Sequence, residues 1–596
     1  MSEHVRPWTA EESLTDLTLY LDWDYMASMV SSLRIYLFNH GSIPIWNYPI
    51  CGGRPEISIP ASWTYTWPSL FAYLFPPNQA LIALWVVMTL VGFFSMRALL
   101  MRWGGTRLGA GVGAAVYVFS GYFSARFNYG QATFAFMHLV PLMMLTFDRA
   151  FQVEWTGSGR IAPLVQTTVI SFLFFTAGLP HALFNFYPAF LMLAIFLVVS
   201  RALGGHALRA LNAMAAPVIA HLLGLWLAAY KLWPVMAWQA YLPRKGVLEE
   251  SYSLLHVLRG TIHMVYGFLD VTAKEAWQVY PSVHQDTFVG PAAWLLAMVG
   301  VWGFLRTRNK AEETDSAGQR KGTLWYALAL LAAGLTLSLG KDHPLSLQYY
   351  LRGLPFVEGI RVASRYQVLT IFSLSILVSS GFAALQRTLQ GRAARSLLTL
   401  LSIATLGPVA LQTGILIWNI EAIPDAEILR SYDTVPDPKP PVLIGGPPVW
   451  GIPGHTKALL ERGYWVANCW EDISFPTAPL SLPFTSKREL SSPPPIGIGR
   501  LTPTTLLLIY SEEGPSRIFP ELPLYPLHRY DATARTSPDG RTFFGRSQIS
   551  NRRLAITAEV PGVRKGFRMS LAGLLVSFLL FAFHVRWRRR TPPPAG

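Results

Sequence analysis

The residues Leu21-Asp22-Trp23-Asp24-Tyr25 open the stretch that decides the fold, and this stretch ends at Pro68. An amphipathic run to His40 comes next, and it is followed by Gly41-Ser42-Ile43-Pro44-Ile45-Trp46-Asn47 and Cys51-Gly52-Gly53-Arg54-Pro55. A membrane-spanning helix needs about 20 mainly apolar residues, and no part of this stretch is both that long and that apolar. The chain becomes almost continuously apolar directly after it. We therefore expect residues 1–78 to form a folded extramembrane loop at the mouth of a helical membrane domain.

Composition places the chain among integral membrane proteins. Of its 596 residues, 52% are hydrophobic and 14% are charged, whereas a soluble globular chain carries about 25% charged residues. The net charge of +15 would indicate nucleic-acid binding only if Lys and Arg clustered beside a soluble fold. Most of the Arg lies instead in short loops between apolar runs, so we expect no nucleic-acid partner. Two cysteines, Cys51 and Cys469, exclude a disulfide framework and leave either one bridge or two free thiols.

Eleven apolar windows are long enough to be spanning helices. They are 79–100, 108–125, 131–149, 161–179, 182–202, 212–233, 288–306, 323–340, 366–386, 396–418 and 569–586. Basic residues fall in alternate loops, and the positive-inside bias assigns all of them to the cytoplasm. They are Arg102, Arg107, Arg149, Arg160, Arg201, Arg209, Arg306, Arg308, Lys310, Arg320, Lys321, Arg387, Arg392, Arg395 and the tail Arg586-Trp587-Arg588-Arg589-Arg590. We therefore expect a mainly α, multi-pass protein of the cytoplasmic membrane.

This topology predicts four parts. The outer N-terminal loop (1–78) precedes a transmembrane domain (79–418) that contains a long aromatic outer loop at 234–287. Residues 419–568 alternate short apolar runs with Pro and Gly, which predicts a small β-rich outer domain, and residues 569–596 form a last helix and a basic tail. An odd number of spans puts the N-terminus outside, although no spanning helix precedes it. We expect a helix ahead of residue 1, and unaided translocation of the short N-terminal segment is the alternative.

Asp22 and Asp24 are the first candidates for chemistry. Two residues apart in an extended segment, their side chains point to the same side. They could share a divalent metal ion, or one could act as a base while the other tunes its pKa. The alternative is a solvated pair of acids, or an Asp that caps a helix beginning at Tyr25.

Arg361 and Arg365 are the second candidates, because they lie on the outer side just before the helix expected from residue 366. On a helix, residues four apart share one face, and two guanidinium groups there could bind a phosphate. Arginines near helix ends also commonly extend to lipid headgroups, and Glu358 could neutralise one of them. The outer location, against the positive-inside bias, favours the phosphate interpretation.

Polar residues within or beside the outer helix ends form a third group. Ionisable residues at membrane depth are functional candidates, although each could instead be a satisfied core group or an interface anchor. The candidates for substrate binding are Arg126, Gln131, His138, His181 and Lys231, with Asn128 and Tyr129 beside them. The sequence has no Gly-rich phosphate loop and no Ser-His-Asp pattern that we can identify.

Several short motifs resemble those of YfhO-like bacterial membrane proteins, in the correct order over residues 20–390. They are Gly41-Ser42-Ile43-Pro44-Ile45-Trp46-Asn47 with Gly52-Gly53, Gly178-Leu179-Pro180-His181, Leu227-Ala228-Ala229-Tyr230-Lys231-Leu232-Trp233-Pro234, and Leu354-Pro355-Phe356 through Arg361 to Arg365. The resemblance implies a GT-C glycosyltransferase, which takes a sugar from a polyprenyl-phosphate donor on the outer membrane face. The first helix typical of that fold is absent here, and the region past residue 420 matches less well.

The resemblance also implies roles for particular residues. A catalytic Asp belongs in the first outer loop, where this chain has Asp24 and Asp22, and basic residues such as Arg361 and Arg365 would hold the donor phosphate. The implied partners are a polyprenyl-phosphate-linked sugar, membrane lipids, and a glycan, lipid or protein acceptor that the sequence does not identify. Two other classes stay open: a transporter or flippase of lipid-linked glycans, and a non-catalytic scaffold for cell-envelope assembly. A transporter would place its site on broken helices near the membrane midplane.

Overall fold

The structure is a computed structural model, and it describes part of the chain. Asp22, Asp24, Cys51, Arg361 and Cys469 lie outside the described residues. The described ranges are 26–27, 29–34, 37–38, 43, 46–47, 54–128, 130–152, 161–177, 180–202, 207–239, 252–263, 287–307, 315–340, 342–351, 362–418, 528–530, 535–536, 542–543, 547–549 and 563–590.

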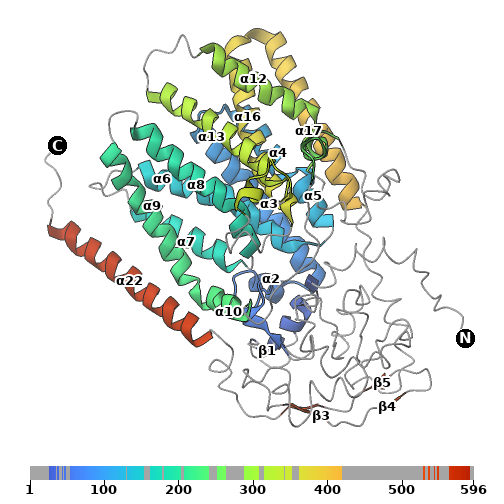
Figure 1. Ribbon diagram of the computed structural model, residues 1–596, viewed down its shortest axis with the longest axis vertical. Coiled ribbons are helices and arrows are strands. Elements are labelled where there is room, and N and C mark those ends of the chain that lie inside the picture. Colours follow the sequence, from blue (N-terminus) through green and yellow to red (C-terminus); the bar gives the residue numbers. More distant parts are fainter. Residues whose placement is uncertain are drawn as a thin grey trace, which may run out of the picture.

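The apolar part of the chain folds into a bundle of helices (Figure 1). In chain order its elements are α3 (Pro77–Arg102), α4 (Arg107–Val118), α5 (Gly121–Asn128), the 3-10 helix η2 (Ala132–Leu139), α6 (Val140–Gln152), α7 (Ile161–Thr176), α8 (Pro180–Ala202), α9 (Ala207–Leu227), α10 (Ala229–Gln239), α12 (Pro291–Thr307), α13 (Asp315–Leu337), the 3-10 helix η7 (Ala363–Tyr366), α16 (Gln367–Thr388), α17 (Gly391–Trp418) and α22 (Val563–Arg590). Each of the eleven predicted windows overlaps one or more of these helices.

Six helical segments among the described residues are long and apolar enough to cross a membrane. They are Pro77–Arg102, Arg107–Asn128, Ala132–Gln152, Leu208–Leu227, Ala363–Thr388 and Gly391–Gly414. Shorter apolar helices are Ala162–Thr176, Phe186–Val199, Pro291–Gly303 and Gly322–Leu337. The chain is therefore a helical, multi-pass membrane protein, and the total of eleven spans stays a prediction.

Helix α16 lies at the centre of its half of the bundle and packs against α4, α12 and α13 (Figure 1). Almost all its residues from Gln367 to Ala383 are buried, including several serines. Close helix approach in membranes relies on small residues. Gly113 of α4 shows this, because an added Cβ there would lie 2.6 Å from the Ser375 carbonyl oxygen. Ser373 in turn donates a 2.6 Å hydrogen bond to the carbonyl oxygen of Ala327 in α13.

Two predicted windows that read as continuous helices are interrupted. The window 108–125 is divided at Phe119 and Ser120, between α4 and α5. The Phe119 carbonyl oxygen, which the interruption frees, accepts hydrogen bonds from Ser124 (3.3 Å) and from Thr413 of α17 (3.1 Å). Side chains thus satisfy the backbone where the helix stops, as a membrane interior requires. The window 212–233 is likewise divided at Ala228, between α9 and α10.

The N-terminal stretch, which is predicted to lie outside, packs onto the bundle. Its elements are β1 (Trp46–Asn47), which pairs antiparallel with β2 (Arg54–Pro55), the 3-10 helix η1 (Glu56–Ser58) and α2 (Ser69–Leu74). The described residues between Met26 and Arg34 are helical and mostly buried. The Arg34 guanidinium donates to the carbonyl oxygens of Ala72 (2.5 Å) and Phe75 (2.8 Å) at the end of α2.

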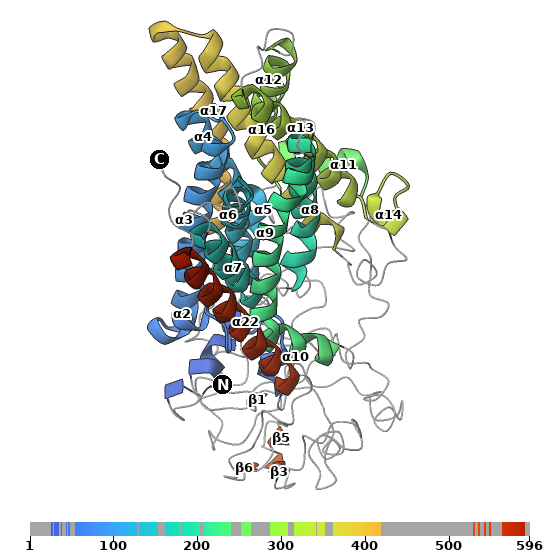
Figure 2. The ribbon, with the colours of Figure 1, turned by 90° about the vertical axis from the view of Figure 1, so that its left-hand side faces the viewer.

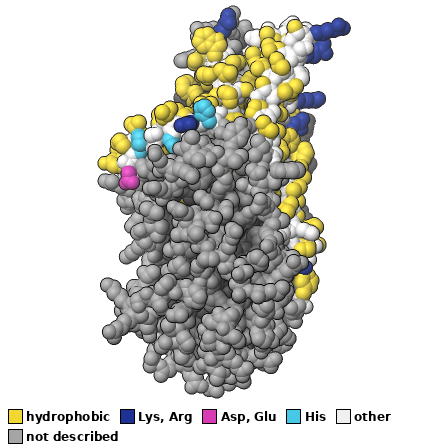
Figure 3. Space-filling view, turned by 90° about the vertical axis from the view of Figure 1, so that its right-hand side faces the viewer, with side chains coloured by type: hydrophobic (Ala, Val, Ile, Leu, Met, Phe, Trp, Pro, Cys, Tyr) yellow, Lys and Arg dark blue, Asp and Glu magenta, His cyan; other side chains and the backbone are white. Residues whose placement is uncertain are grey.

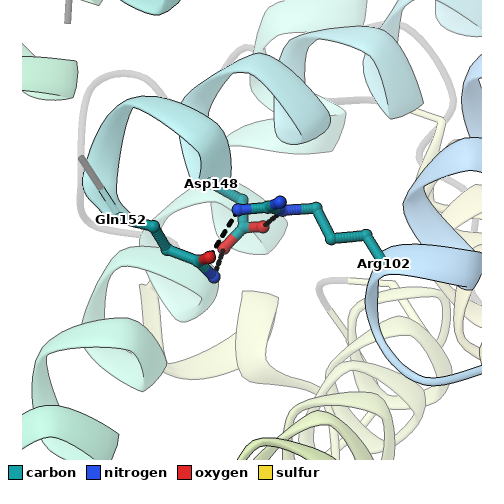
Figure 4. A network of polar contacts seen from close by, with 3 residues as sticks. All are labelled: Arg102, Asp148 and Gln152. Carbon is teal, nitrogen blue, oxygen red and sulfur yellow. Dashed lines mark hydrogen bonds and ion pairs between the residues drawn. The ribbon is translucent and has the colours of Figure 1, made fainter. Parts of the chain in front are cut away.

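A polar network joins α3 to α6 at the end of the bundle that carries basic residues (Figure 4). The Arg102 Nε forms an ion pair with the buried carboxylate of Asp148, and Arg102 Nη2 donates a 2.5 Å hydrogen bond to Gln152 Oε1. The Gln152 amide completes the network with a 3.1 Å hydrogen bond to Asp148 Oδ1. Figure 3 shows further Lys and Arg side chains gathered at the upper end of the molecule, above an apolar surface. The side of the membrane that this end faces stays a prediction.

Two predicted parts lie mainly outside the described residues. Within 419–562 the structure describes two short antiparallel pairs, β3 (His528–Tyr530) with β6 (Ser547–Ile549) and β4 (Arg535–Thr536) with β5 (Thr542–Phe543). The β-rich domain and the four-part division therefore stay predictions. In the outer loop 234–287 the end of α10 and a short helix, α11 (Leu254–Ile262), are described. A further short helix, α14 (Leu347–Leu351), packs against α13, as α11 does (Figure 2).

Candidate functional site

The helix η2 is the element around which the candidate site is built. It runs for eight residues, from Ala132 to Leu139, as a 3-10 helix, and all eight are buried. Runs of 3-10 helix longer than three or four residues are uncommon, and within a helical segment they often mark a functional hinge or a strained sequence. The turn before it depends on Gly130, whose φ of 75° suits glycine. The Gln131 backbone N–H donates a 2.9 Å hydrogen bond to the Arg126 carbonyl oxygen, so the half-buried Gln131 begins η2 directly beside α5.

Arg126 lies almost fully buried against η2, with 1% of its surface exposed. Its Nη1 donates a 3.0 Å hydrogen bond to the Tyr122 carbonyl oxygen one turn earlier in α5. The guanidinium carbon lies 3.5 Å from the centroid of the Tyr122 ring and 4.7 Å from that of Phe134. Cation–π contacts of this kind stabilise a desolvated guanidinium group by about 2 kcal/mol.

Arg365 reaches the same ring from η7. Its guanidinium carbon lies 5.5 Å from the Phe134 centroid. Its carbonyl oxygen accepts a 3.2 Å hydrogen bond from the hydroxyl of Tyr122, which is 243 residues away in the sequence. We call Tyr122, Arg126, Phe134 and Arg365 the arginine cluster. Two like charges at one aromatic ring repel each other, and an anion such as a phosphate beside both of them would add attractions that outweigh this repulsion.

The outer N-terminal loop packs on the same 3-10 helix. The Trp67 ring lies edge-on to Phe136 of η2, with 5.5 Å between the centroids. The Trp67 Nε1 donates a 2.9 Å hydrogen bond to the Leu173 carbonyl oxygen in α7. The loop for which the sequence predicts catalytic carboxylates and the arginine cluster are thus attached to one element.

Two other predicted candidates contact the protein itself. His138 is fully buried, stacks on Phe123 at a centroid distance of 4.1 Å, and has Nδ1 3.0 Å from the Ala135 carbonyl oxygen. Lys231 is 1% exposed, and its Nζ donates hydrogen bonds to the carbonyl oxygens of Ile59 (2.9 Å) and Ser62 (3.3 Å). These contacts favour structural roles: His138 fills the core behind η2, and Lys231 fastens the outer loop to α10.

The remaining candidates are placed only in part. His181 is the second residue of α8, and its side chain lies outside the described part of the chain, as do Asp22, Asp24 and Arg361. Among the described residues no group of three or more His, Cys, Asp or Glu could hold a metal ion. The metal site considered at Asp22 and Asp24 therefore stays a prediction.

The structure also shows a polar group that the sequence reasoning missed. His221 of α9 lies with Nδ1 2.8 Å from Ser171 Oγ of α7 and Nε2 3.4 Å from the Tyr187 hydroxyl of α8. Its ring stacks on Phe190 with 5.6 Å between the centroids. A histidine inside an apolar window is a signal that could have directed attention to it.

Comparisons with known proteins give a distant likeness of structure. No protein-family profile and no curated protein sequence matches the chain. A mutant of the arabinofuranosyltransferase AftD from Mycobacteria superposes with a TM-score of 0.37 and 15% identity, over 74% of this chain and 32% of that one. ArnT from Cupriavidus metallidurans, solved with undecaprenyl phosphate bound, superposes with a TM-score of 0.33 and 11% identity, over 78% of this chain and 86% of that one. The chain spans about a third of the length of AftD, and neither likeness assigns it a substrate or a catalytic residue.

Proposed function

We propose that this protein is a membrane glycosyltransferase that moves a sugar from a polyprenyl-phosphate donor to an acceptor on the outer face of the cytoplasmic membrane. One observation carries the proposal: two guanidinium groups, from α5 and η7, meet at Phe134 of η2. The outer N-terminal loop packs on the same element through Trp67. Such a transfer needs a group that binds the phosphate and a carboxylate that acts as the base. The N-terminal loop carries the candidates for the base, Asp22 and Asp24.

The proposed reaction is a single displacement. Asp24 takes the proton from the acceptor hydroxyl, whose oxygen attacks the anomeric carbon of the donor sugar. The bond from that carbon to the phosphate oxygen breaks, and the polyprenyl phosphate leaves with the bonding electron pair. Asp22 is the second carboxylate, and it either tunes the pKa of Asp24 or joins it in holding a divalent ion.

The arginines act on the leaving group. Arg365, with Arg361 four residues before it and Arg126 at the same ring of Phe134, stabilises the negative charge that develops on the phosphate. Arginine suits this role better than lysine, because its planar fork donates two parallel hydrogen bonds to phosphate oxygens. Phe134 and Tyr122 keep the guanidinium groups in place through their ring faces.

The test compares purified variants in sugar transfer from a polyprenyl-phosphate-linked donor. We expect Asp24→Asn to abolish transfer, and Arg365→Gln to lower kcat/KM by about 100-fold or more, as the loss of one charge-stabilising donor does in other enzymes. Arg365→Lys should recover part of that loss, because it keeps the charge but not the fork. Arg387→Gln is the matched control, since Arg387 lies at the opposite end of the same helical segment, with Nε bonded to the Ala383 carbonyl oxygen.

Two results would overturn the proposal. Near-normal turnover by Asp24→Asn would remove Asp24 as the base, and wild-type kcat/KM in Arg365→Gln would remove the phosphate role of the arginine cluster. A wild-type protein that carries a lipid-linked sugar across liposomes without breaking its phosphate bond would be a transporter instead.

A further inference from the structure

Tyr65 has a backbone conformation that is unusual for its residue type. Its φ is 60°, and among the described residues it is the only non-glycine with a positive φ. A side chain with a Cβ is strained in this left-handed region, and such strain persists only where the surroundings impose it. The neighbouring Thr64 and Thr66 are both buried. Strained residues of this kind cluster at functional sites.

The contacts of Tyr65 show what imposes the conformation. Its hydroxyl donates a 2.8 Å hydrogen bond to the Ile43 carbonyl oxygen, within the Gly41–Asn47 motif of the outer loop. Its own carbonyl oxygen accepts a 2.6 Å hydrogen bond from the hydroxyl of Tyr230 in α10. Tyr65 thus connects the outer loop to the helical bundle through both its backbone and its side chain.

Helix α10 holds this segment at more than one point. Lys231, which follows Tyr230, donates to the carbonyl oxygens of Ile59 and Ser62. Residues 59–65 of the loop therefore lie against two consecutive residues of α10. A lysine aimed at backbone carbonyls and a tyrosine hydroxyl aimed at a third carbonyl make a rigid attachment rather than a substrate site.

Helix α10 is itself fixed by the C-terminal helix. The Tyr230 backbone N–H donates a 2.7 Å hydrogen bond to Ser570 Oγ of α22, and its ring lies 5.8 Å from that of Phe567. An added Cβ at Gly566 would lie 2.6 Å from the Ala229 carbonyl oxygen, so α22 approaches α10 closely. Figure 2 shows α22 crossing the bundle obliquely to reach α10. The contacts therefore run without interruption from α22 through Tyr230 and Tyr65 to the outer loop.

We propose that Tyr65 and Tyr230 are positioning residues for the proposed transfer, which fix Ile43 and residues 59–65 of the N-terminal loop against α10. This inference rests on the proposed function. Because they hold the loop and not the donor phosphate, their loss should lower kcat and leave the donor KM nearly unchanged. Misplacement of a catalytic group by about 1 Å costs about 100-fold in rate.

Four variants test the inference by sugar transfer and thermal unfolding. Tyr65→Phe and Tyr230→Phe each remove one hydroxyl and should lower kcat by about 10-fold to 100-fold. The donor KM should stay within about twofold of wild type, because a loss of positioning changes kcat and not the binding of the donor. Tyr65→Gly relieves the strain of the positive φ but removes the hydroxyl and the ring that reach Ile43, so it should also lose kcat. Tyr326→Phe is the matched control, since this buried tyrosine donates to the Ala189 carbonyl oxygen in the bundle.

A second measurement does not depend on activity. Hydrogen exchange at Trp46, Asn47 and Arg54, in the β1–β2 pair, should become faster in Tyr65→Phe and stay unchanged in Tyr326→Phe. If wild type transfers sugar while Tyr65→Phe keeps its kcat and its exchange rates, the inference is wrong and the proposed function stands. If the loss of kcat in Tyr65→Phe is explained by a lower unfolding temperature, the two tyrosines are structural and the inference is also wrong. If exchange rises as expected but wild type transfers no sugar, the proposed function fails and the role in transfer fails with it, while the attachment of the loop is upheld.

Discussion

Arg126 and Lys231 are equally buried, yet the protein uses their charges differently. The Arg126 guanidinium lies over two aromatic rings, whereas the Lys231 ammonium group donates to backbone carbonyl oxygens of the outer loop. A guanidinium group is delocalised and weakly hydrated, so ring faces suit it, while an ammonium group is a compact charge that needs oxygen partners. Arg126 therefore lies in an aromatic environment, whereas Lys231 holds Ile59 and Ser62 against α10.

Tyr65 should make stability depend on pH in the alkaline range. Burial raises the pKa of its phenol from 10.0 to about 12. The folded state then holds the proton more tightly than the unfolded state, so this contribution is complete below about pH 10 and is lost as the pH rises through about 12. We expect the unfolding temperature in detergent to fall over that range, and to fall less steeply in Tyr65→Phe. Equal slopes for the two proteins between pH 10 and pH 12 would show that Tyr65 ionises as readily when folded as when unfolded.

The sequence identified individual site residues only because charged groups are costly to bury. Arg126, Arg365, His138 and Lys231 were singled out because charged or titratable groups are expensive beside apolar helices, but the sequence does not say which of them meet. Arg126 and Arg365 belong to segments far apart in the chain and come together only where Phe134 of η2 contacts both of them. Tyr65 carries no signal, since a positive φ is normally marked by Gly, Asn or Asp.

At the scale of single elements, apolar length predicted where helices form and not where they stop. The interruptions at Phe119–Ser120 and at Ala228 contain no proline, and both windows stay apolar across them. Their causes are tertiary: Thr413 of α17 binds the freed Phe119 carbonyl oxygen, and Tyr230 after the second interruption is held by Ser570 of α22. Periodicity within one window cannot report a partner that lies elsewhere in the chain.

The packing of α3 on η2 should depend on a single glycine. An added Cβ at Gly92 would lie 2.8 Å from both Cβ and Cδ2 of His138, and His138 cannot retreat because it stacks on Phe123. We expect Gly92→Ala to lower the free energy of unfolding by about 1–3 kcal/mol, as overpacking of a core does. The measurement is thermal unfolding in detergent.

Gly111→Ala provides the comparison for Gly92→Ala. Gly111 lies in α4, and an added Cβ there would meet no atom within 4 Å. Alanine should therefore leave stability unchanged or raise it by about 1 kcal/mol through its higher helix propensity. If both substitutions had the same effect, close contact with His138 would not be what fixes η2 in place.

The two ends of the helical bundle differ. The proposed function requires the end with the arginine cluster to face outward. Helix α13 is antiparallel to α16, because Gly334 near the end of α13 lies against Thr370 near the start of α16. The exposed Asp342 therefore lies at the end opposite the turn between α16 and α17, where Ala393 is exposed among basic residues. The arginine cluster lies at the Asp342 end, since Arg365 directly precedes α16.

Cysteine labelling in whole cells tests this orientation. In a background with Cys51 and Cys469 replaced by serine, a membrane-impermeant maleimide should label Asp342→Cys in intact cells and Ala393→Cys only after the membrane is permeabilised. Neither substitution removes a basic residue, so the positive-inside signal that is expected to set the topology stays intact. The reverse pattern would place the arginine cluster in the cytoplasm, out of reach of a donor whose sugar faces outward. In that case a transferase acting on the outer leaflet would be physically excluded, whatever the activity of the Asp24 and Arg365 variants.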